Sequence, residues 1–375
     1  MPLTKIQSRG TENVGQGSSN LIINGAMNVS QRGTSFTIDT ANTNTYCLDR
    51  FFFSHNANTN GQCTVTQDSS APNGFKNSFK VDVTTADTSL AVAHADSVYH
   101  RIEAQNLQGL AFGTSDAKNI TLSFYVKSNK TGTYSVNIAQ NDNSYKQANL
   151  TYTINSADTW ERKTLTFTGD TSGVINDDNG HGLEIAWHLA LGTNFTSGSN
   201  SASFASYADA NFGANHGVNI FDNTSNEWFL TGVQLEIGSQ ASDFQHEDIG
   251  TTRKKCMRYF HSINGAGHSD PTDSAYGRYI CFGQDNNGLR WFHHFPEEMR
   301  SAPTMTANNI SSSTIQHFNY NTQTGISMTG TGLNEGGKRT GQIFFTFSSG
   351  AGVGSTVSWR WNNNPDASFD FNSEL

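Results

Sequence analysis

Short runs in which apolar and polar residues alternate recur along the chain, and they constrain its fold more than any other feature. In one run, Ile120, Leu122, Phe124 and Val126 are apolar, and Thr, Ser, Tyr and Lys stand in the alternate positions. Successive side chains of a strand point to opposite faces, so this period of two predicts a half-buried β-strand. The same period recurs at 183–189, 229–237, 343–347 and 357–361. Gly, Asn, Asp and Ser separate the runs as turn formers, so we predict an all-β protein.

One segment departs from this period. Between residues 248 and 261, Ile249, Cys256 and Phe260 recur near helical spacing, with acidic residues before them and basic residues in the later turns. That charge order suits the helix dipole. We predict a linker helix over 247–263 that divides two β domains. The basic residues Arg253, Lys254, Lys255 and Arg258 are interpreted as a solvated helix face, with a nucleic-acid patch as the alternative.

Four regions follow from this division: an N-terminal arm over 1–20, a first β domain over 21–246, the linker helix over 247–263 and a second β domain over 264–375. The first 20 residues are rich in Gly, Ser, Gln and Asn and carry no strand pattern. Such an extended arm is often ordered only by a partner. We therefore expect residues 1–20 to dock on another protein.

Composition limits the classes of partner. The chain has 375 residues, and 23 Lys and Arg against 32 Asp and Glu give a net charge of −9. A negative field disfavours nucleic acid and anionic lipid. No apolar run approaches the ~18 residues of a membrane span, and we expect no membrane insertion and no secretory signal. We interpret the four cysteines, which lack CxxC spacing, as buried thiols: Cys47, Cys63, Cys256 and Cys281.

Signatures of catalysis are absent: the chain contains no HExxH, GxSxG, GxxxxGKS or GxGxxG motif. A glycosidase needs only two carboxylates that flank a sugar, and these carry no local signature. Glu184, Glu297 and Glu298 are the candidates for such a role. Glu184 stands on the outward phase of a strand and the adjacent pair follows Pro296 in a predicted turn. We predict that the protein is not an enzyme and uses no cofactor.

Oxygen-rich and histidine-rich segments raise the question of a metal. The segment 176–180, Asn-Asp-Asp-Asn-Gly, offers oxygen ligands for Ca²⁺, but a tight turn is the favoured interpretation. His293 and His294 are neighbours on a predicted strand, so they point to opposite faces and cannot chelate together. Asp49 and Arg50 are predicted to form a structural ion pair. We predict no metal site.

Aromatic residues give the more useful signal, because exposed Tyr and Trp rings stack on sugars while polar side chains bond sugar hydroxyls. In the second β domain we predict four stacking platforms for a glycan: Tyr276, Tyr279, Trp291 and Trp361. Packing in the core or between subunits is the alternative for each of them.

Several sequence blocks stand in a fixed order along the chain. The blocks in the first domain are Asn20 to Thr34, Tyr46 to Phe51, Arg101 to Leu110, Ile120 to Ser128, Thr159 to Thr166, Trp228 to Gly238 and Phe244 to Glu247. The linker block is Cys256-Met-Arg-Tyr-Phe260, and the tip block is Phe295-Pro-Glu-Glu-Met-Arg-Ser-Ala-Pro-Thr304. In this order the blocks resemble those of the phage tail-fibre and virion appendage proteins that carry an N-terminal jelly-roll domain, except that the family has Tyr at the last place of the linker block.

The resemblance implies a jelly-roll β-sandwich like that of carbohydrate-binding modules, a short linker helix and a second small β-sandwich domain. It also implies a homotrimeric virion protein, made in the host cytoplasm, which attaches to tail or adaptor proteins by residues 1–20. The expected function is that of a tail fibre or receptor-binding protein that recognises host surface glycans. A structural virion appendage without receptor binding is the alternative, and a glycan depolymerase is the third possibility.

Overall fold

The computed structural model describes residues 20–39, 43–55, 60–142, 145–264, 276–283, 288–310, 315–318, 325–347, 356–361 and 367–375. In strands 276–283, 315–318 and 356–361, and at 264, 325–329, 334–335 and 347, only the backbone is described. The chain divides into two compact units, Met1–Ile249 and Gly250–Leu375. Each is described by itself. Of the predicted docking arm, only Asn20 lies within the described residues.

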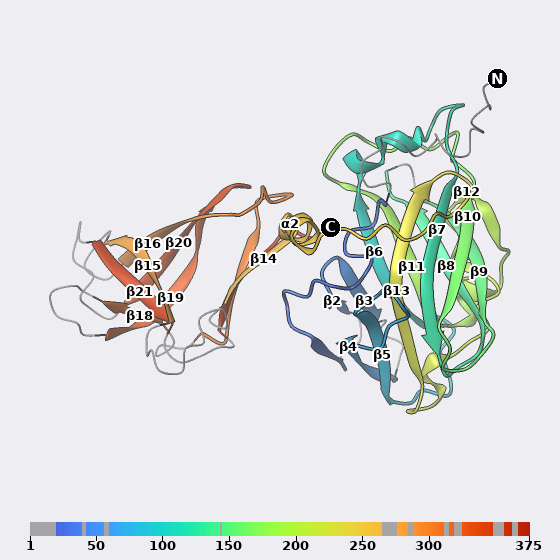
Figure 1. Ribbon diagram of the computed structural model, residues 1–375, viewed down its shortest axis with the longest axis horizontal. Coiled ribbons are helices and arrows are strands. Elements are labelled where there is room, and N and C mark those ends of the chain that lie inside the picture. The colour runs from blue at the N-terminus through green and yellow to red at the C-terminus, as the bar shows by residue number, and fades with distance from the viewer. Residues whose placement is uncertain are drawn as a thin grey trace, which may run out of the picture. The chain divides into compact units, whose positions relative to one another are not determined.

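Unit 1 is a sandwich of two antiparallel sheets (Figure 1). The six-stranded sheet runs, in spatial order, β1 (Ser35–Ile38), β4 (Gln62–Asp68), β5 (Ser78–Thr85), β13 (Glu227–Ile237), β7 (Ile120–Ser128) and β10 (Glu161–Phe167). The seven-stranded sheet runs β12 (Ser201–Ser206), β9 (Lys146–Ile154), β8 (Gly132–Gln140), β11 (His181–Leu191), β6 (Ala95–Glu103), β3 (Phe51–His55) and β2 (Thr43–Tyr46). The all-β prediction is confirmed.

The predicted alternation places the core between these sheets. From β7, Ile120, Leu122, Phe124 and Val126 are fully buried, and Trp187 of β11 meets Phe124 edge-to-face with ring centroids 6.0 Å apart. Short helices lie in the connections: η2 (Ala104–Leu110), α1 (Thr193–Thr196), η3 (Asp209–Asn211) and η4 (Ile220–Asp222). The predicted thiols Cys47, Cys63 and Cys256 are buried and free, and the side chain of Cys281 lies outside the described residues.

The block that opens the domain docks the entering chain onto β13. Asn20 Oδ1 accepts hydrogen bonds from the amides of Ile22 and Leu235, at 3.0 and 3.1 Å. A Cβ atom on Gly25 would lie 2.0 Å from the Val233 carbonyl oxygen, so only glycine fits at this close approach. The Asn20 hydrogen bonds and the close approach at Gly25 together hold the first residues of the sandwich against β13.

Asp49 and Arg50 are structural, but with partners other than those predicted. The Asp49 carboxylate accepts hydrogen bonds at 2.6 Å from both the backbone amide and the side-chain amide of Gln31. Arg50 is 1 % exposed and donates to the Arg101 carbonyl at 2.6 Å. Both side chains therefore satisfy buried backbone and amide groups rather than a ligand.

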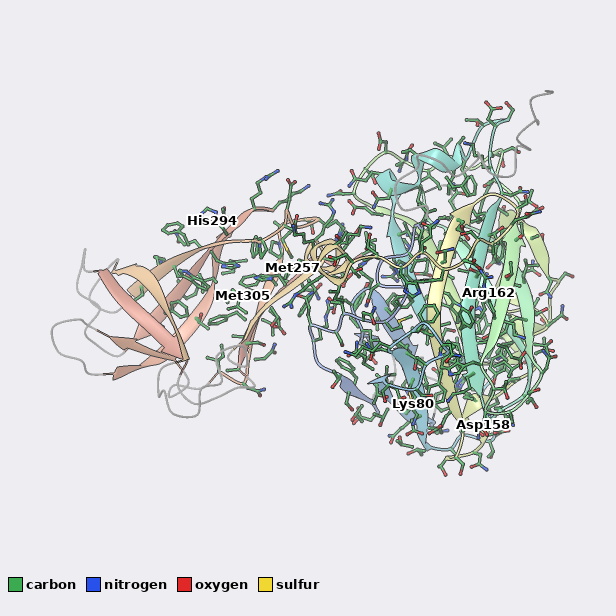
Figure 2. The ribbon with its side chains drawn as sticks, viewed as in Figure 1. Lys80, Asp158, Arg162, Met257, His294 and Met305 are labelled. Carbon is green, nitrogen blue, oxygen red and sulfur yellow. The ribbon has the colours of Figure 1, made fainter. Side chains whose placement is uncertain are left out.

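The closing block of the first domain acts as a clamp for the exit segment 239–246. Gln234 donates to the Asp243 carbonyl at 3.2 Å and accepts from the Gln245 amide at 2.8 Å, and the Phe244 ring packs on Phe75 at 4.9 Å between centroids. Arg162 also donates to the exit segment, at the Ser242 carbonyl. Figure 2 labels Arg162 and Lys80, which both belong to the six-stranded sheet.

Unit 2 combines a closed barrel with a three-stranded sheet. The barrel strands are β15 (Tyr276–Gly283), β16 (Gly288–His294), β20 (Thr340–Phe347), β19 (Gly325–Gly336), β18 (Ile315–Phe318) and β21 (Thr356–Trp361). The sheet is β14 (Phe260–Asn264), β22 (Ser368–Asn372) and β17 (Thr304–Asn308). A small β-sandwich was expected here; the β content is as predicted, and six of the strands close on themselves.

The linker helix is shorter than predicted. α2 spans Ile249–Met257, and the chain from Phe260 onward is the strand β14, which pairs with β22 so that Phe260 faces Asn372. The helical spacing of Phe260 was therefore misread. Its partner strand lies more than a hundred residues further along, and no local pattern reveals that pairing.

The tip block braces unit 2 from within. Arg300 donates from Nε to the Ser373 carbonyl at 2.6 Å and from a terminal nitrogen to the Glu374 carbonyl at 2.8 Å. The amides of Phe295 and Met299 donate to the carbonyls of Arg339 and Lys338, at 2.9 and 2.8 Å. In the parts of the chain that are described, no helix is long and apolar enough to cross a membrane.

Candidate functional site

The outer face of the seven-stranded sheet is covered over only part of its width. The segment between β11 and β13 closes over the side of β8 and β9: His188 bonds the Phe212 carbonyl at 3.0 Å, and Gln147 donates to the Ala208 carbonyl at 2.8 Å. Asn137 and Asn149 are buried beneath it. The covering segment therefore forms hydrogen bonds with the polar side chains on one half of the sheet. On the other half, formed by β2, β3 and β6, aromatic side chains lie on the outer face.

Three aromatic rings line up across that second half. Tyr46, Phe52 and Tyr99 are register partners on β2, β3 and β6. Phe52 and Tyr99 stack with centroids 5.0 Å apart and planes 6° apart, and Tyr46 lies 4.9 Å from Phe52. The Arg101 guanidinium carbon stands 4.7 Å from the Phe52 centroid. Phe52 is buried, and Tyr46 and Tyr99 are partly buried, so only a part of each tyrosine side chain reaches the surface.

Glu184 stands at the centre of the remaining polar groups. Arg101, its register partner on β6, donates from Nε to Glu184 Oε2 at 2.7 Å. Tyr145 lies close enough for the Glu184 charge to raise its pKa, and His181 Nε2 lies 3.9 Å from Oε2. The Glu184 side chain is only 9 % exposed. A buried carboxylate is stable when paired and hydrogen-bonded in this way.

The electrostatics of this cluster keep the guanidinium charged and its neighbours neutral. Burial alone would lower the pKa of Arg101, but the charge and the hydrogen bond of Glu184, together with Tyr46 and Tyr99, outweigh it and the pKa is raised. Burial, followed by the Glu184 charge, raises the pKa of Tyr145. Burial and the charge of Arg101 lower the pKa of His181 to about 3. Asn141 donates to His181 Nδ1 at 2.7 Å, so the imidazole proton sits on Nε2.

Tyr207 completes the rim. It meets Tyr145 edge-to-face with centroids 5.0 Å apart, and it is 38 % exposed. We call the set Tyr99, Arg101, Tyr145, Glu184 and Tyr207 the tyrosine–carboxylate site. It combines aromatic faces, hydroxyls that donate and accept, a carboxylate and a guanidinium. Chemically, it can bind a neutral polyhydroxylated ligand by stacking and hydrogen bonds.

Of the four stacking platforms predicted in the second β domain, the structure describes the side chain of one. Trp291 is only 7 % exposed and belongs to the core cluster of unit 2, so the alternative of core packing applies to it and its ring face is closed to a ligand. Tyr276 and Trp361 are register partners on β15 and β21. Their side chains and that of Tyr279 lie outside the described residues, so these three stay predictions.

The other candidate residues have structural surroundings. Asp178 Oδ1 accepts from the Gly180 amide at 2.8 Å, which is the tight turn that was favoured over a calcium loop. Glu298 pairs with Arg339 on an exposed segment. Among the described residues, no group of three or more His, Cys, Asp or Glu side chains is arranged to hold a metal ion.

Sequence reasoning found Glu184 but assigned it to a possible acid pair, and it missed the tyrosines around it. One local signal was present: Tyr99 and Arg101 share a phase of β6 with Ser97, so polar and aromatic residues alternate there with Val98 and Ile102. Tyr145 and Tyr207 gave no signal, because they come from loops or strand ends far apart in the chain.

Comparisons with known proteins give similarity at low identity. No family model matches the chain, and no curated protein matches it. Among solved structures, a family 4 carbohydrate-binding module is 16 % identical over 57 % of this chain and 97 % of that chain, with a TM-score of 0.30. The family 11 carbohydrate-binding module of Clostridium thermocellum, in complex with a tetrasaccharide, is 12 % identical over 56 % of this chain and 99 % of that chain, with a TM-score of 0.25.

A third solved structure is the enzymatically active domain of tailspike protein 4 from bacteriophage CBA120. It is 14 % identical over 58 % of this chain, with a TM-score of 0.30. The match spans 21 % of the tailspike chain, about a fifth of its length. At these identities and TM-scores, no ligand, activity or partner of these proteins is carried over, and the function is argued from the residues of this chain.

Proposed function

We propose that this protein is a non-enzymatic glycan-binding protein whose tyrosine–carboxylate site holds a sugar. The observation that carries the proposal is the arrangement around Glu184: a paired carboxylate at the base, with the partly buried rings of Tyr99 and Tyr145 and the exposed ring of Tyr207 around it. Tyrosine rings offer flat apolar faces at a small conformational cost, and the ring of Tyr207, 38 % exposed, is the most open of the three.

The charge balance of the site favours a neutral glycan. Arg101 and Glu184 compensate each other at 2.7 Å, so the pair presents donors and acceptors without net charge. A sugar diol can accept from the guanidinium and donate to the carboxylate at once. An anionic sugar would face the Glu184 carboxylate, and the chain as a whole carries a net charge of −9.

The biological setting that we propose is an external appendage of a phage virion, made in the host cytoplasm, with the glycan on the host surface as its target. The ordered blocks that resemble virion appendage proteins support this setting. In this proposal the protein is a homotrimer, residues 1–20 attach it to other virion proteins, and several weak sugar contacts act together through their effective concentration.

Glycan binding is tested by titrating purified full-length protein with neutral and acidic polysaccharides from candidate hosts. Glu184→Gln keeps the shape of the side chain but removes its charge, and we expect an affinity loss of about 10- to 100-fold, because a hydrogen bond to a charged group contributes about 1.5–3 kcal/mol. Tyr207→Ala should also weaken binding. The matched control is Glu161→Gln on β10, in the opposite sheet, which should bind as the unaltered protein does. Equal affinity of Glu184→Gln and Glu161→Gln would refute the site.

The virion role needs a separate measurement. Soluble protein should compete with phage for adsorption to the host if it is the receptor-binding protein, and should leave adsorption unchanged if it is a structural appendage. Light scattering at micromolar concentration tests the trimer, and a stable monomer would remove that part of the proposal. Release of reducing ends from the polysaccharide would instead support a depolymerase.

A further inference from the structure

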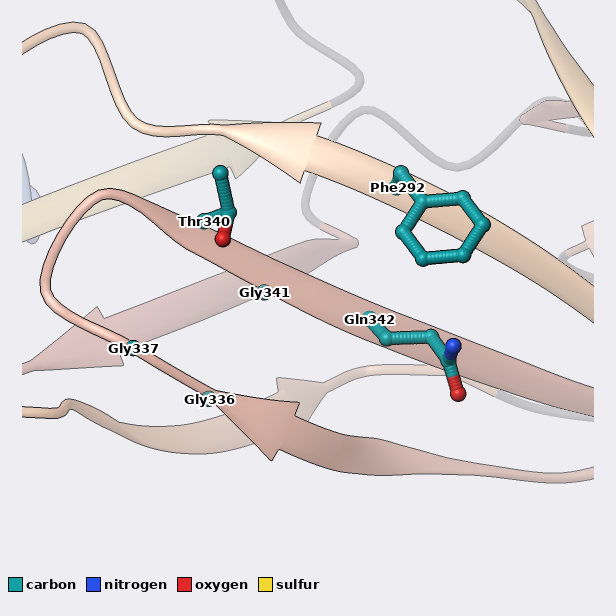
Figure 3. Close-up of a pocket in the computed structure, with 6 residues that line it drawn as sticks. All are labelled: Phe292, Gly336, Gly337, Thr340, Gly341 and Gln342. Atoms are coloured by element: carbon teal, nitrogen blue, oxygen red, sulfur yellow. The ribbon is translucent and has the colours of Figure 1, made fainter.

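A second pocket lies on unit 2, independent of the tyrosine–carboxylate site. It has a volume of about 310 Å³ and opens between β16 and the β19–β20 hairpin (Figure 3). The residues that line it are Phe292, Gly336, Gly337, Thr340, Gly341 and Gln342. All six are described and none carries a formal charge, so the pocket is polar through an amide, a hydroxyl and bare backbone.

Phe292 is the unusual member of this set. It is 54 % exposed, although its neighbour Trp291 on the same strand is 7 % exposed and packs in the core. Strand alternation explains why the two rings lie on opposite faces, but not why an aromatic residue is used on the outer face. In the part of unit 2 whose side chains are described, it is the only large apolar side chain that is exposed to this extent.

Polar groups stand directly beside the exposed ring. Gln342 on β20 is the register partner of Phe292, and Thr340 lies two residues earlier on the same strand. Figure 3 shows the Gln342 side chain and the Phe292 ring projecting from neighbouring strands, with Thr340 further along β20. An amide offers two donors and an acceptor, and a hydroxyl offers both roles. The pocket therefore places an aromatic face beside polar groups.

The hairpin wall is held in place before any ligand binds. A Cβ atom on Gly336 or Gly341 would lie 2.9 Å from a methyl carbon of Leu333, so the Leu333 side chain packs closely against both positions. The Gly337 amide closes the turn on the Thr340 carbonyl at 2.8 Å. The tip block fixes the same hairpin through the carbonyls of Lys338 and Arg339. A preformed wall reduces the entropy lost on binding.

We propose that this pocket binds a single neutral pyranose ring, stacked on Phe292 and hydrogen-bonded by Gln342 and Thr340. The neutral lining argues for an uncharged sugar, because nothing among the lining residues compensates a carboxylate or an ammonium group. A flat aromatic face beside an amide and a hydroxyl matches a ring with one apolar face and hydroxyls at its edge. The site needs no residue of unit 1, so the full chain carries two separate sugar sites.

The test uses full-length protein and the methyl glycosides of glucose, galactose, mannose and N-acetylglucosamine, with binding measured by ligand-observed NMR and calorimetry. Phe292→Leu keeps an apolar side chain but removes the aromatic face, and Phe292→Tyr keeps the face. We expect Phe292→Leu to weaken binding of one glycoside about 2- to 10-fold and Phe292→Tyr to preserve it, since an aromatic ring stacked on the ligand contributes beyond its buried area. Gln342→Ala should weaken the same glycoside.

Glu184→Gln separates the two sites. In the Glu184→Gln background, the effect of Phe292→Leu should persist, even if the tyrosine–carboxylate site binds nothing. Equal binding by the Phe292→Leu and unaltered proteins would overturn the proposal, and so would a preference for glucuronate or glucosamine over the neutral glycosides. A change in oligomeric state in Phe292→Leu, seen by light scattering without any loss of sugar binding, would assign the pocket to a contact between copies of the chain and also overturn it.

Discussion

Acidification should loosen the cover of the seven-stranded sheet through His188. Its Nδ1 accepts from the Ser97 hydroxyl at 2.7 Å, and its Nε2 donates to the Phe212 carbonyl at 3.0 Å, so both ring nitrogens are used in the neutral form. A second proton would remove the acceptor at Nδ1. Burial lowers the pKa of His188 to about 3, followed by the charge that His216 would carry.

The folded pKa therefore lies below the unfolded value of about 6.5, and the unfolded chain binds the extra proton first as the pH falls. The stabilisation is fully present above pH ~6.5 and is lost as the pH falls towards 3. One pKa unit corresponds to about 1.4 kcal/mol, so His188 should cost about 2 kcal/mol of the free energy of unfolding at pH 5, and about 5 kcal/mol below pH 3. The side chain is fully buried, so solvent screening does not reduce this figure much.

The perturbation that isolates this effect is His188→Gln, which keeps hydrogen-bonding capacity but cannot titrate. Urea unfolding is followed at pH 7.5 and pH 5.0 by deuterium exchange in peptides from β8 and β11, which report on unit 1 alone. We expect the loss of unfolding free energy between the two pH values to be about 2 kcal/mol smaller in the variant than in the unaltered protein. An identical loss in both proteins would refute the assignment of the proton to His188.

Three further outcomes test the packing arguments by thermal and urea unfolding. Gly25→Ala should lower the unfolding free energy of unit 1 by about 1–3 kcal/mol, because its Cβ would lie 2.0 Å from the Val233 carbonyl oxygen; an unchanged midpoint would contradict the close approach. Leu289→Ala should cost unit 2 about 2–5 kcal/mol, since the side chain is fully buried in its core, and a loss below 1 kcal/mol would show a core that collapses around the cavity. Lys80→Ala should cost about 1 kcal/mol or less although Nζ lies 2.6 Å from Glu227, since the Glu227 carboxylate is 37 % exposed and solvent screens the pair; a larger loss would contradict this screening.

The contrast between Trp291 and Phe292 shows where sequence reasoning lost information. Alternation states that neighbouring side chains on a strand face opposite ways, but it does not state which way is inward. The larger ring, Trp291, was taken as the ligand platform, yet it lies in the core of unit 2 and Phe292 is the exposed one. The direction is decided by which face of β16 meets the rest of unit 2, which involves residues far along the chain.

The tyrosine–carboxylate site was partly readable. Glu184 was placed on the outward phase of its strand, and that phase is correct: its register partner is Arg101, on the side opposite the core residues Leu183 and Ile185. A side chain on the outward phase is not necessarily exposed to solvent, however: Tyr145 and the paired Arg101 cover the Glu184 carboxylate. A charged residue on a sheet face can be buried by loops whose path no strand pattern records.

By itself, the sequence determined the all-β class, two β regions with a helix between them, and the strands whose alternation is clearest, such as 120–126 and 229–237, since alternation, turn residues and end charges are local signals. Only the tertiary structure decided that Phe260 begins a strand, that six strands of unit 2 close into a barrel, and that Arg101, Tyr145, Glu184 and Tyr207 meet. These are pairings across long separations in the chain, and their free energy arises from burial and hydrogen bonds that exist only once the sheets are assembled.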